Sequence, residues 1–174
     1  MTITAVQKSI LDPFTEETLN CLQEMVGTDS HPGEAFEDEL EKFRFKGYAV
    51  AADVDGERGK GTILIHFYPE TALKIGNDLL KKMSGGDVPP KGDIDQDIED
   101  ALAEWGNTVV GLATRSVADN DPNVQFEPPY FVRNTEDMDN LLQDVQEVIT
   151  IPVHTEQAGR FYFNYLLHNK TGAA

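Results

Sequence analysis

The sequence predicts an α+β fold in which a largely antiparallel sheet packs against amphipathic helices. Apolar residues recur at helical spacing in three segments. Two pairs of strand-like runs are joined by short linkers rich in turn-forming residues, as antiparallel hairpins require. The order of helix, hairpin, helix, helix and strands is typical of helices laid on an antiparallel sheet. A chain of 174 residues fits one domain, or at most two small ones closely joined, and we take residues 1–174 as a single domain.

The first helix is expected over residues 12–27, in "DPFTEETLNCLQEMVG". Asp12 is placed to cap it, Pro13 to occupy its first position and Gly27 to end it. Cys21 falls on the apolar face of this helix, which predicts a core thiol. The next segment, residues 28–43, is predicted to be an acidic loop with at most a short irregular strand.

The runs "KGYAVAADVDG" and "KGTILIHFYPE" predict a hairpin whose turn is "DGERGKG". A second amphipathic helix begins at Pro69 and is stopped by Gly85 and Gly86. Asp93 or Asp95 caps a long third helix. A strand interrupted by a Pro-Pro pair follows in "NVQFEPPYFVRN", and "QEVITIPVHT" with "RFYFNYLLHN" predicts a closing hairpin.

The balance of charge argues against several classes of partner. The chain has 14 Lys and Arg against 31 Asp and Glu, a net charge of −17. Nucleic acids and anionic membrane surfaces are bound by clustered cations, so neither is expected as a partner. A single cysteine fits a reducing compartment, and no segment approaches the roughly 18 apolar residues of a membrane helix. We therefore expect a cytoplasmic protein without membrane insertion.

The third helix, "DIEDALAEWGNTVVGLATRSVAD", carries an unusual set of central residues. At about 100° per residue, its apolar positions form one stripe, namely Ile94, Ile98, Leu102, Trp105, Val109 and Leu112. Glu104 and Asn107 lie away from that stripe, one turn apart, with Asp100 and Gly111 on the same side. Gly106 lies just off the stripe, where a missing side chain could let another backbone approach. A Glu and an Asn at this spacing usually belong to a solvated helix face without further function. Each glycine in the helix interior, however, lowers helix stability by about 1 kcal/mol relative to alanine, and close packing or access for a partner would offset that loss.

The segment "EWGNTVVG" resembles the E-x-x-N signature, often E-x-G-N with a later Gly, of the CheC/CheX/FliY family of chemotaxis phosphatases. The resemblance extends in order to "DPFTEETLNCLQEMVG", "KGTILIHFYPETALKIGNDLL", "FEPPYFVRN" and the closing hairpin. Only one helix carries the full motif. In this respect and in its length, the chain is similar to the CheX type. Trp105 replaces the smaller apolar residue usual in the motif, and the acidic residues 34–41 match nothing in the family pattern.

This resemblance implies a phosphatase that dephosphorylates a phosphorylated CheY-type response regulator. Asn107 is then expected to orient the attacking water and Glu104 to dock on a lysine of the receiver. The resemblance implies no cofactor of the protein's own, since Mg²⁺ is supplied in the partner's active site, and it implies a homodimer. The run "RFYFNYLLHN" is apolar on much of both faces and unsuited to a bare sheet edge, so it either pairs at the edge with a second chain or lies centrally, covered on both sides.

Two alternatives stay open at this stage. Glu17 and Asn20 match the bare E-x-x-N spacing in the first helix, without the neighbouring glycines, and are either a solvated face or a second site. A non-catalytic module of the same fold that binds a receiver or a flagellar-motor component is the rival to an enzyme. The four histidines show no metal-ligand spacing, so no metal site is predicted.

Overall fold

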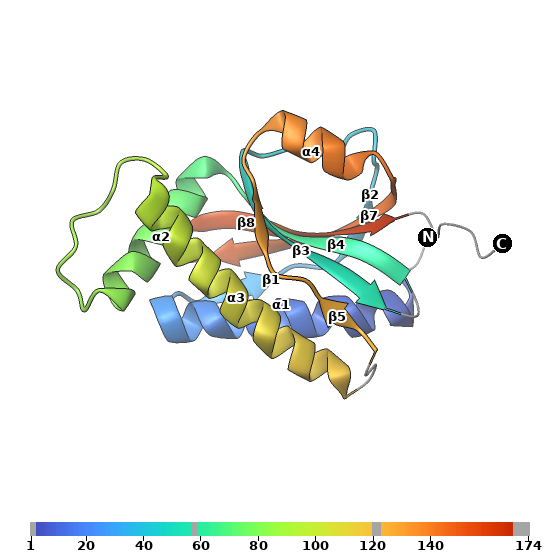
Figure 1. The fold of residues 1–174 in the computed structure, drawn as a ribbon, viewed down its shortest axis with the longest axis horizontal. Helices are drawn as coiled ribbons and strands as arrows, with labels where there is room; N and C mark the ends of the chain where they lie inside the picture. The colour runs from blue at the N-terminus through green and yellow to red at the C-terminus, as the bar shows by residue number, and fades with distance from the viewer. Residues whose placement is uncertain (1–2, 57–58, 120–122, 169–174) are drawn as a thin grey trace.

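The computed structural model describes residues 3–56, 59–119 and 123–168 and confirms the α+β prediction (Figure 1). Its helices are α1 (Ala5–Val26), α2 (Pro69–Met83), α3 (Gln96–Ala118) and α4 (Thr135–Leu142). Its strands are β1 (Ser30–Pro32), β2 (Phe36–Asp38), β3 (Tyr48–Gly56), β4 (Gly59–Phe67), β5 (Gln125–Phe126), β6 (Tyr130–Val132), β7 (Val145–Thr155) and β8 (Gly159–His168). The turn predicted between β3 and β4 includes residues 57 and 58, which lie outside the described residues.

The strands form an antiparallel sheet in the order β1-β7-β8-β4-β3-β5, with β2 also paired to β7 and β6 to β3. Both predicted hairpins are present, because β3 pairs with β4 and β7 pairs with β8 in antiparallel register. The predicted Pro-Pro interruption separates β5 from β6, and the two short strands both pair with β3. The next strand after α3 in the chain, β5, therefore lies at the edge of the sheet, beside β3.

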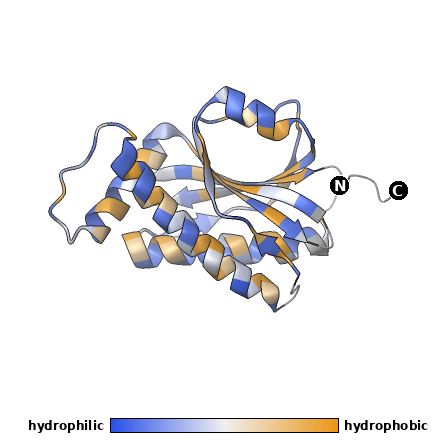
Figure 2. Ribbon diagram, in the orientation of Figure 1, coloured by the Kyte–Doolittle hydropathy of each residue, from blue (hydrophilic) through white to orange (hydrophobic). Residues whose placement is uncertain are grey.

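The sheet has a helical layer on one face and a thinner cover on the other (Figure 1). The inward faces of α1, α2 and α3 share one apolar core with the strands. On the opposite face, Met138 of α4 and Phe43 pack with strand residues such as Leu64 and Leu166 in a second core. In Figure 2 the helices carry polar and apolar residues in alternation, as burial on one side requires.

Strand β8 lies in the interior of the sheet, which corrects the prediction of an edge strand paired with a second chain and bears out the alternative of a central strand. It pairs along its length with β7 on one side and with β4 on the other. Phe161, Phe163 and Tyr165 enter the core beneath the helices, whereas Leu166 enters the core beneath α4. Both faces are apolar because both are covered, so the strand gives no argument for pairing with a second chain.

Helix α1 begins earlier than the sequence analysis predicted. Its cap is Thr4, whose side chain accepts a hydrogen bond from the Gln7 backbone N–H while the Gln7 side chain accepts one from the Thr4 N–H. Asp12 is therefore not the cap, and Pro13 lies inside the helix. Proline removes one helical hydrogen bond, and α1 continues through it because Leu11 and Phe14 on either side are buried in the core. Gly27 ends the helix in a left-handed conformation, with φ 73°, as predicted.

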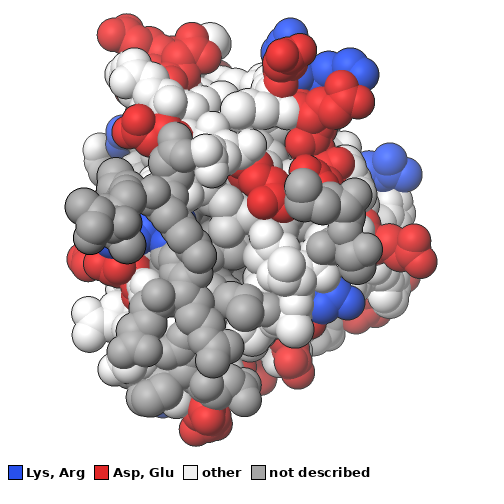
Figure 3. Space-filling view, turned by 90° about the vertical axis from the view of Figure 1, so that its right-hand side faces the viewer, with Lys and Arg blue, Asp and Glu red and all other residues white. Residues whose placement is uncertain are grey.

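The acidic segment after α1 forms two short edge strands, β1 and β2, which pair with successive parts of β7. The Thr150 hydroxyl donates a hydrogen bond to the Asp38 carboxylate at 3.1 Å, and Phe36 is exposed. Acidic side chains are spread over much of the face shown in Figure 3, with Lys and Arg at a few places between them. Residues 34–41 hold five of the 31 acidic residues, so the excess of negative charge is not confined to them.

His66 of β4 is fully buried in a chain of hydrogen bonds that runs across the sheet. Its Nε2 accepts from the Lys46 backbone N–H at 2.9 Å, so Nδ1 carries the proton and donates to Asn164 Oδ1 at 2.8 Å. Asn164 Nδ2 donates to Thr150 Oγ1 at 2.9 Å. Burial, opposed in part by the Asn164 hydrogen bond and aided by the Lys46 charge, lowers the pKa of His66 from 6.5 to about 4. The histidine is therefore neutral in the folded protein.

We expect His66 to make stability depend on pH between its unfolded and folded pKa values. Its pKa is lower in the folded state, so the unfolded chain binds the proton first and stability is lost as the pH falls through about 6.5 toward about 4. When the pH is lowered from about 8 to about 5, the titration of this histidine should lower the free energy of unfolding by about 2 kcal/mol. Urea unfolding at both pH values measures the loss. It should be absent in His66→Gln and retained in His154→Gln, which removes an exposed histidine; an unchanged loss in His66→Gln would contradict the assignment.

Candidate active site on helix α3

The start of α3 is fixed by side chains from the preceding connector. Asp95 is the cap, and its carboxylate accepts from the Ile98 backbone N–H at 3.1 Å, which confirms the second of the two predicted caps. The Lys91 ammonium contacts Asp95 at 3.0 Å and Asp97 at 2.8 Å. The Lys91 backbone also exchanges two hydrogen bonds with the Asn77 side chain of α2. The connector is therefore tied to both helices that it joins.

The buried stripe of α3 sets the rotation of the helix about its axis. Ile98, Leu102, Trp105 and Val109 have no exposed surface, and the Trp105 ring lies 6.1 Å from the Phe67 ring of β4. Ile94 and Leu112, the two ends of the predicted stripe, are half-buried. With this face held against the core, the opposite face of α3 must point to solvent.

Glu104 and Asn107 are both exposed on that opposite face, as the spacing predicts. They are three residues apart, which places them about 4.5 Å apart along the helix axis and on adjacent turns. Among the residues that the structure describes, neither side chain makes a hydrogen bond or an ion pair. A carboxylate and an amide thus stand next to each other, both free to contact another molecule.

The two glycines of the motif differ in their surroundings. A Cβ on Gly106 would meet Val50 Cγ1 of β3 at 3.2 Å and Pro129 Cγ at 3.5 Å, so this position is where the Pro-Pro segment crosses α3. The close approach expected at Gly106 is therefore made by side chains. A Cβ on Gly111 would meet nothing within 4 Å, and this residue is exposed. Packing accounts for Gly106 but not for Gly111.

Substitutions at these two glycines should change stability in opposite directions. Gly111→Ala should raise the free energy of unfolding by about 1 kcal/mol, because the new methyl group meets open space and alanine favours the helix. Gly106→Val should lower it by about 1–3 kcal/mol, because its methyl groups overpack against Val50 and Pro129. Urea unfolding measures both. A Gly106→Val variant as stable as wild type would show that the Pro-Pro segment does not hold α3.

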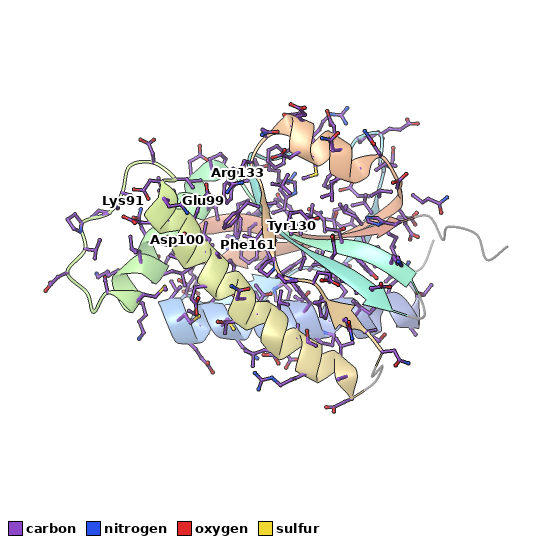
Figure 4. All side chains as sticks on the ribbon, viewed as in Figure 1. Lys91, Glu99, Asp100, Tyr130, Arg133 and Phe161 are labelled. Carbon is purple, nitrogen blue, oxygen red and sulfur yellow. The ribbon has the colours of Figure 1, made fainter. Side chains whose placement is uncertain are left out.

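An ion pair also connects the edge of the sheet to α3. Arg133, which follows β6, donates from Nε to a Glu99 carboxylate oxygen at 3.0 Å and from its terminal nitrogen to the other oxygen. Figure 4 shows Arg133 and Glu99 close together where β6 passes the first turns of the helix. The Arg133 guanidinium also lies over the Phe131 ring, 5.1 Å from its centroid. With Pro129 packed on Gly106, this pair fixes the position of the exposed face.

The pair in the first helix is placed differently. Glu17 is half-buried and accepts a hydrogen bond from the Ser116 hydroxyl of α3 at 2.9 Å, whereas Asn20 is exposed. Glu17 therefore links α1 to α3. Cys21, on the apolar side of the same helix, is buried as predicted, and burial beside Glu17 raises the pKa of its thiol to about 11.

Within the described parts of the chain, no group of three or more His, Cys, Asp or Glu side chains is placed to hold a metal ion. None of the helices in those parts is both long and apolar enough to cross a membrane.

Comparison with known proteins shows the family to which the chain belongs. The family model described as chemotaxis phosphatase CheX matches residues 48–154, which include all of α3. The chain belongs to the CheX family. A search of curated proteins gave no match.

Solved structures of CheX-like proteins have the same fold. The chain is 24% identical to a chemotaxis protein CheX from Desulfovibrio desulfuricans, with a TM-score of 0.67, covering 91% of this chain and 99% of that one. It is 16% identical to a chain of a CheX-CheY-BeF₃-Mg²⁺ complex from Borrelia burgdorferi, with a TM-score of 0.63, covering 91% and 97%. It is 17% identical to FliY from Thermotoga maritima, with a TM-score of 0.64, covering 97% and 93%.

Proposed function

We propose that this CheX-family protein hydrolyses the phosphoryl group on the active-site aspartate of a CheY-type response regulator. The observation that carries the proposal is the carboxylate of Glu104 beside the amide of Asn107 on the exposed face of α3, both without a partner among the described residues. Both lie within the segment that matches the family model. The solved complex from Borrelia burgdorferi, which pairs a CheX with a CheY, supports the choice of partner.

Asn107 orients the attacking water in this proposal. Hydrolysis of an acyl phosphate passes through a loose transition state, so it depends on positioning more than on a strong base. The amide oxygen accepts a hydrogen bond from water and aligns the water oxygen with phosphorus. The new oxygen–phosphorus bond forms as the bond to the aspartyl oxygen breaks, which restores the aspartate and releases inorganic phosphate. An uncharged amide suits this place because a carboxylate would repel the phosphoryl oxygens.

Glu104 docks the helix by pairing with a lysine of the receiver. A charge-assisted hydrogen bond at a position one turn before Asn107 holds the amide in register with the phosphoryl group. Mg²⁺ belongs to the receiver's site and neutralises phosphoryl charge there, so the protein needs no cofactor of its own. We propose that the protein acts with its receiver in the cytoplasm.

A non-catalytic binding module of the same fold is the second candidate. The observation that favours it is the similarity in fold to the middle domain of FliM from Vibrio alginolyticus, at 13% identity and a TM-score of 0.60. Release of inorganic phosphate from a phosphorylated CheY-type receiver distinguishes the two. We expect catalytic amounts of this protein to accelerate release above the receiver's own rate; binding without acceleration would identify the module.

We also propose a homodimer, on the family resemblance alone. With β8 in the interior of the sheet, the interface must use another surface. Because each chain carries a charge of −17, association should be stronger at higher salt, where repulsion is screened. Light scattering at micromolar concentration should give about twice the 19.3 kDa of one chain at moderate salt. A mass of one chain across that range would exclude the dimer.

A further inference from the structure

The exposed face of α3 extends well beyond Glu104 and Asn107. At about 100° per residue, seven positions of α3 fall in a band of about 80°. They are Asp97, Asp100, Glu104, Asn107, Gly111, Arg115 and Ala118, and all seven are exposed. From the start of the helix to its end, the band presents three acids, an amide, a bare position, a cation and an alanine. It is a continuous surface with negative charge at one end and positive charge at the other.

Arg115 is the unexplained member of this band. It is the only Lys or Arg in α3, in a chain with a large excess of acids. Among the described residues it has no hydrogen bond or ion pair, whereas Lys91 and Arg133 are both paired with carboxylates of α3. A cation in the last turn also stabilises the helix dipole. That effect explains a cation at the end of the helix, but it does not require one on this face.

The spacing determines what Arg115 can reach. It lies eight residues after Asn107, about 12 Å further along the helix axis. A phosphoryl group aligned with Asn107 is therefore beyond the reach of its guanidinium. Arg115 would instead meet the surface of the receiver beside the phosphorylation site. Gly111, between the two, leaves open space for the receiver to approach the helix closely.

We propose that Arg115 pairs with a carboxylate on the surface of the phosphorylated receiver and so fixes the direction in which α3 docks. This inference rests on the proposed function. Glu104 binds a cation of the receiver at one end of the face and Arg115 binds an anion at the other. If the helix were reversed, Arg115 would be brought toward the receiver's lysine and Glu104 toward its carboxylate. Such like-charge contacts are what exclude a wrong orientation.

The test compares Arg115 with a cation that shares its helix-end position but not its face. Lys82 is exposed in the last turn of α2, so Lys82→Gln and Lys82→Glu match the charge and dipole changes of Arg115→Gln and Arg115→Glu. With a phosphorylated CheY-type receiver at low salt, Arg115→Gln should raise KM about fivefold and Arg115→Glu further, with kcat unchanged. The increase should shrink at high salt. The Lys82 variants should leave KM close to that of wild type.

The outcomes separate this inference from the proposed function. If Glu104 and Asn107 variants lose activity but Arg115→Glu has the same KM as Lys82→Glu, only the role of Arg115 is overturned. If Glu104 and Asn107 variants keep full activity, the proposed function itself fails. A fall in kcat for Arg115→Gln, with KM unchanged, would also contradict a docking role.

Discussion

Asn107→Ala should lower kcat for phosphate release by about a hundredfold or more, while binding of the phosphorylated receiver is retained. The expected loss corresponds to a few kcal/mol of barrier, the usual cost of removing one group that acts mainly in the transition state. The fold should be unaffected, because the side chain is exposed and has no partner among the described residues. Steady-state phosphate release and a binding titration with a beryllofluoride-activated receiver measure the two effects separately.

Asn20→Ala is the matched control. Asn20 is also exposed on a helix, three residues after a glutamate, but that glutamate is hydrogen-bonded to Ser116. This variant, alone or with Glu17→Ala, should keep most of the activity. Loss of half the rate would indicate a second site on α1. Unchanged turnover in Asn107→Ala would remove the assignment of the water-orienting group.

Glu104→Ala should raise KM by about tenfold or more and lower kcat as well, because it removes the docking contact and the register that the contact imposes. The wild-type KM should rise with salt, since a charged contact at a surface is screened. Glu104→Gln should reduce the salt dependence of KM, with the part that Arg115 contributes remaining, and should keep part of the affinity. Glu16→Ala, which removes an exposed carboxylate from α1, is the control for net charge and should have little effect. A wild-type KM that does not change with salt would point to another docking surface.

The sequence predicted the parts of the fold that depend on local pattern. The strand-like runs of β3, β4, β7 and β8 and the apolar stripe of α3 were confirmed because each of these elements has one or both faces in a large core. The same stripe predicted that Glu104 and Asn107 would be exposed, because fixing one side of a helix fixes the other. Asp95 and Gly27 mark helix ends through well-understood capping preferences.

Other features depended on signals that compete or act at long range. The capping box formed by Thr4 and Gln7 can be recognised in "TAVQ", but Asp12 followed by Pro13 is a competing signal for a helix start. The helix begins at the earlier signal because residues on both sides of the proline are buried in the core. Helix α4 was missed because its eight residues are too few to show a period and only Met138 is buried. The interior position of β8 could not be predicted, since apolar residues on both faces fit a covered strand and a paired edge equally.

The surroundings of the site could not be predicted from local pattern either. Gly106 indicated a close approach but not that Pro129 makes it. The contacts that hold α3 join residues far apart in the chain, Arg133 with Glu99 and Ser116 with Glu17. Such pairs have no local sequence signature, because each arises only when separate elements are packed together.

The most direct test of the account is a crystal structure of this protein bound to a CheY-type receiver that carries beryllofluoride and Mg²⁺. We predict that the exposed face of α3 enters the receiver's active site, with the Asn107 amide oxygen within about 3 Å of a water aligned with beryllium. The Glu104 carboxylate should lie within about 3 Å of a receiver lysine. A complex in which the receiver's Mg²⁺ site faces α1 or a sheet edge, with Asn107 left in solvent, would contradict the account.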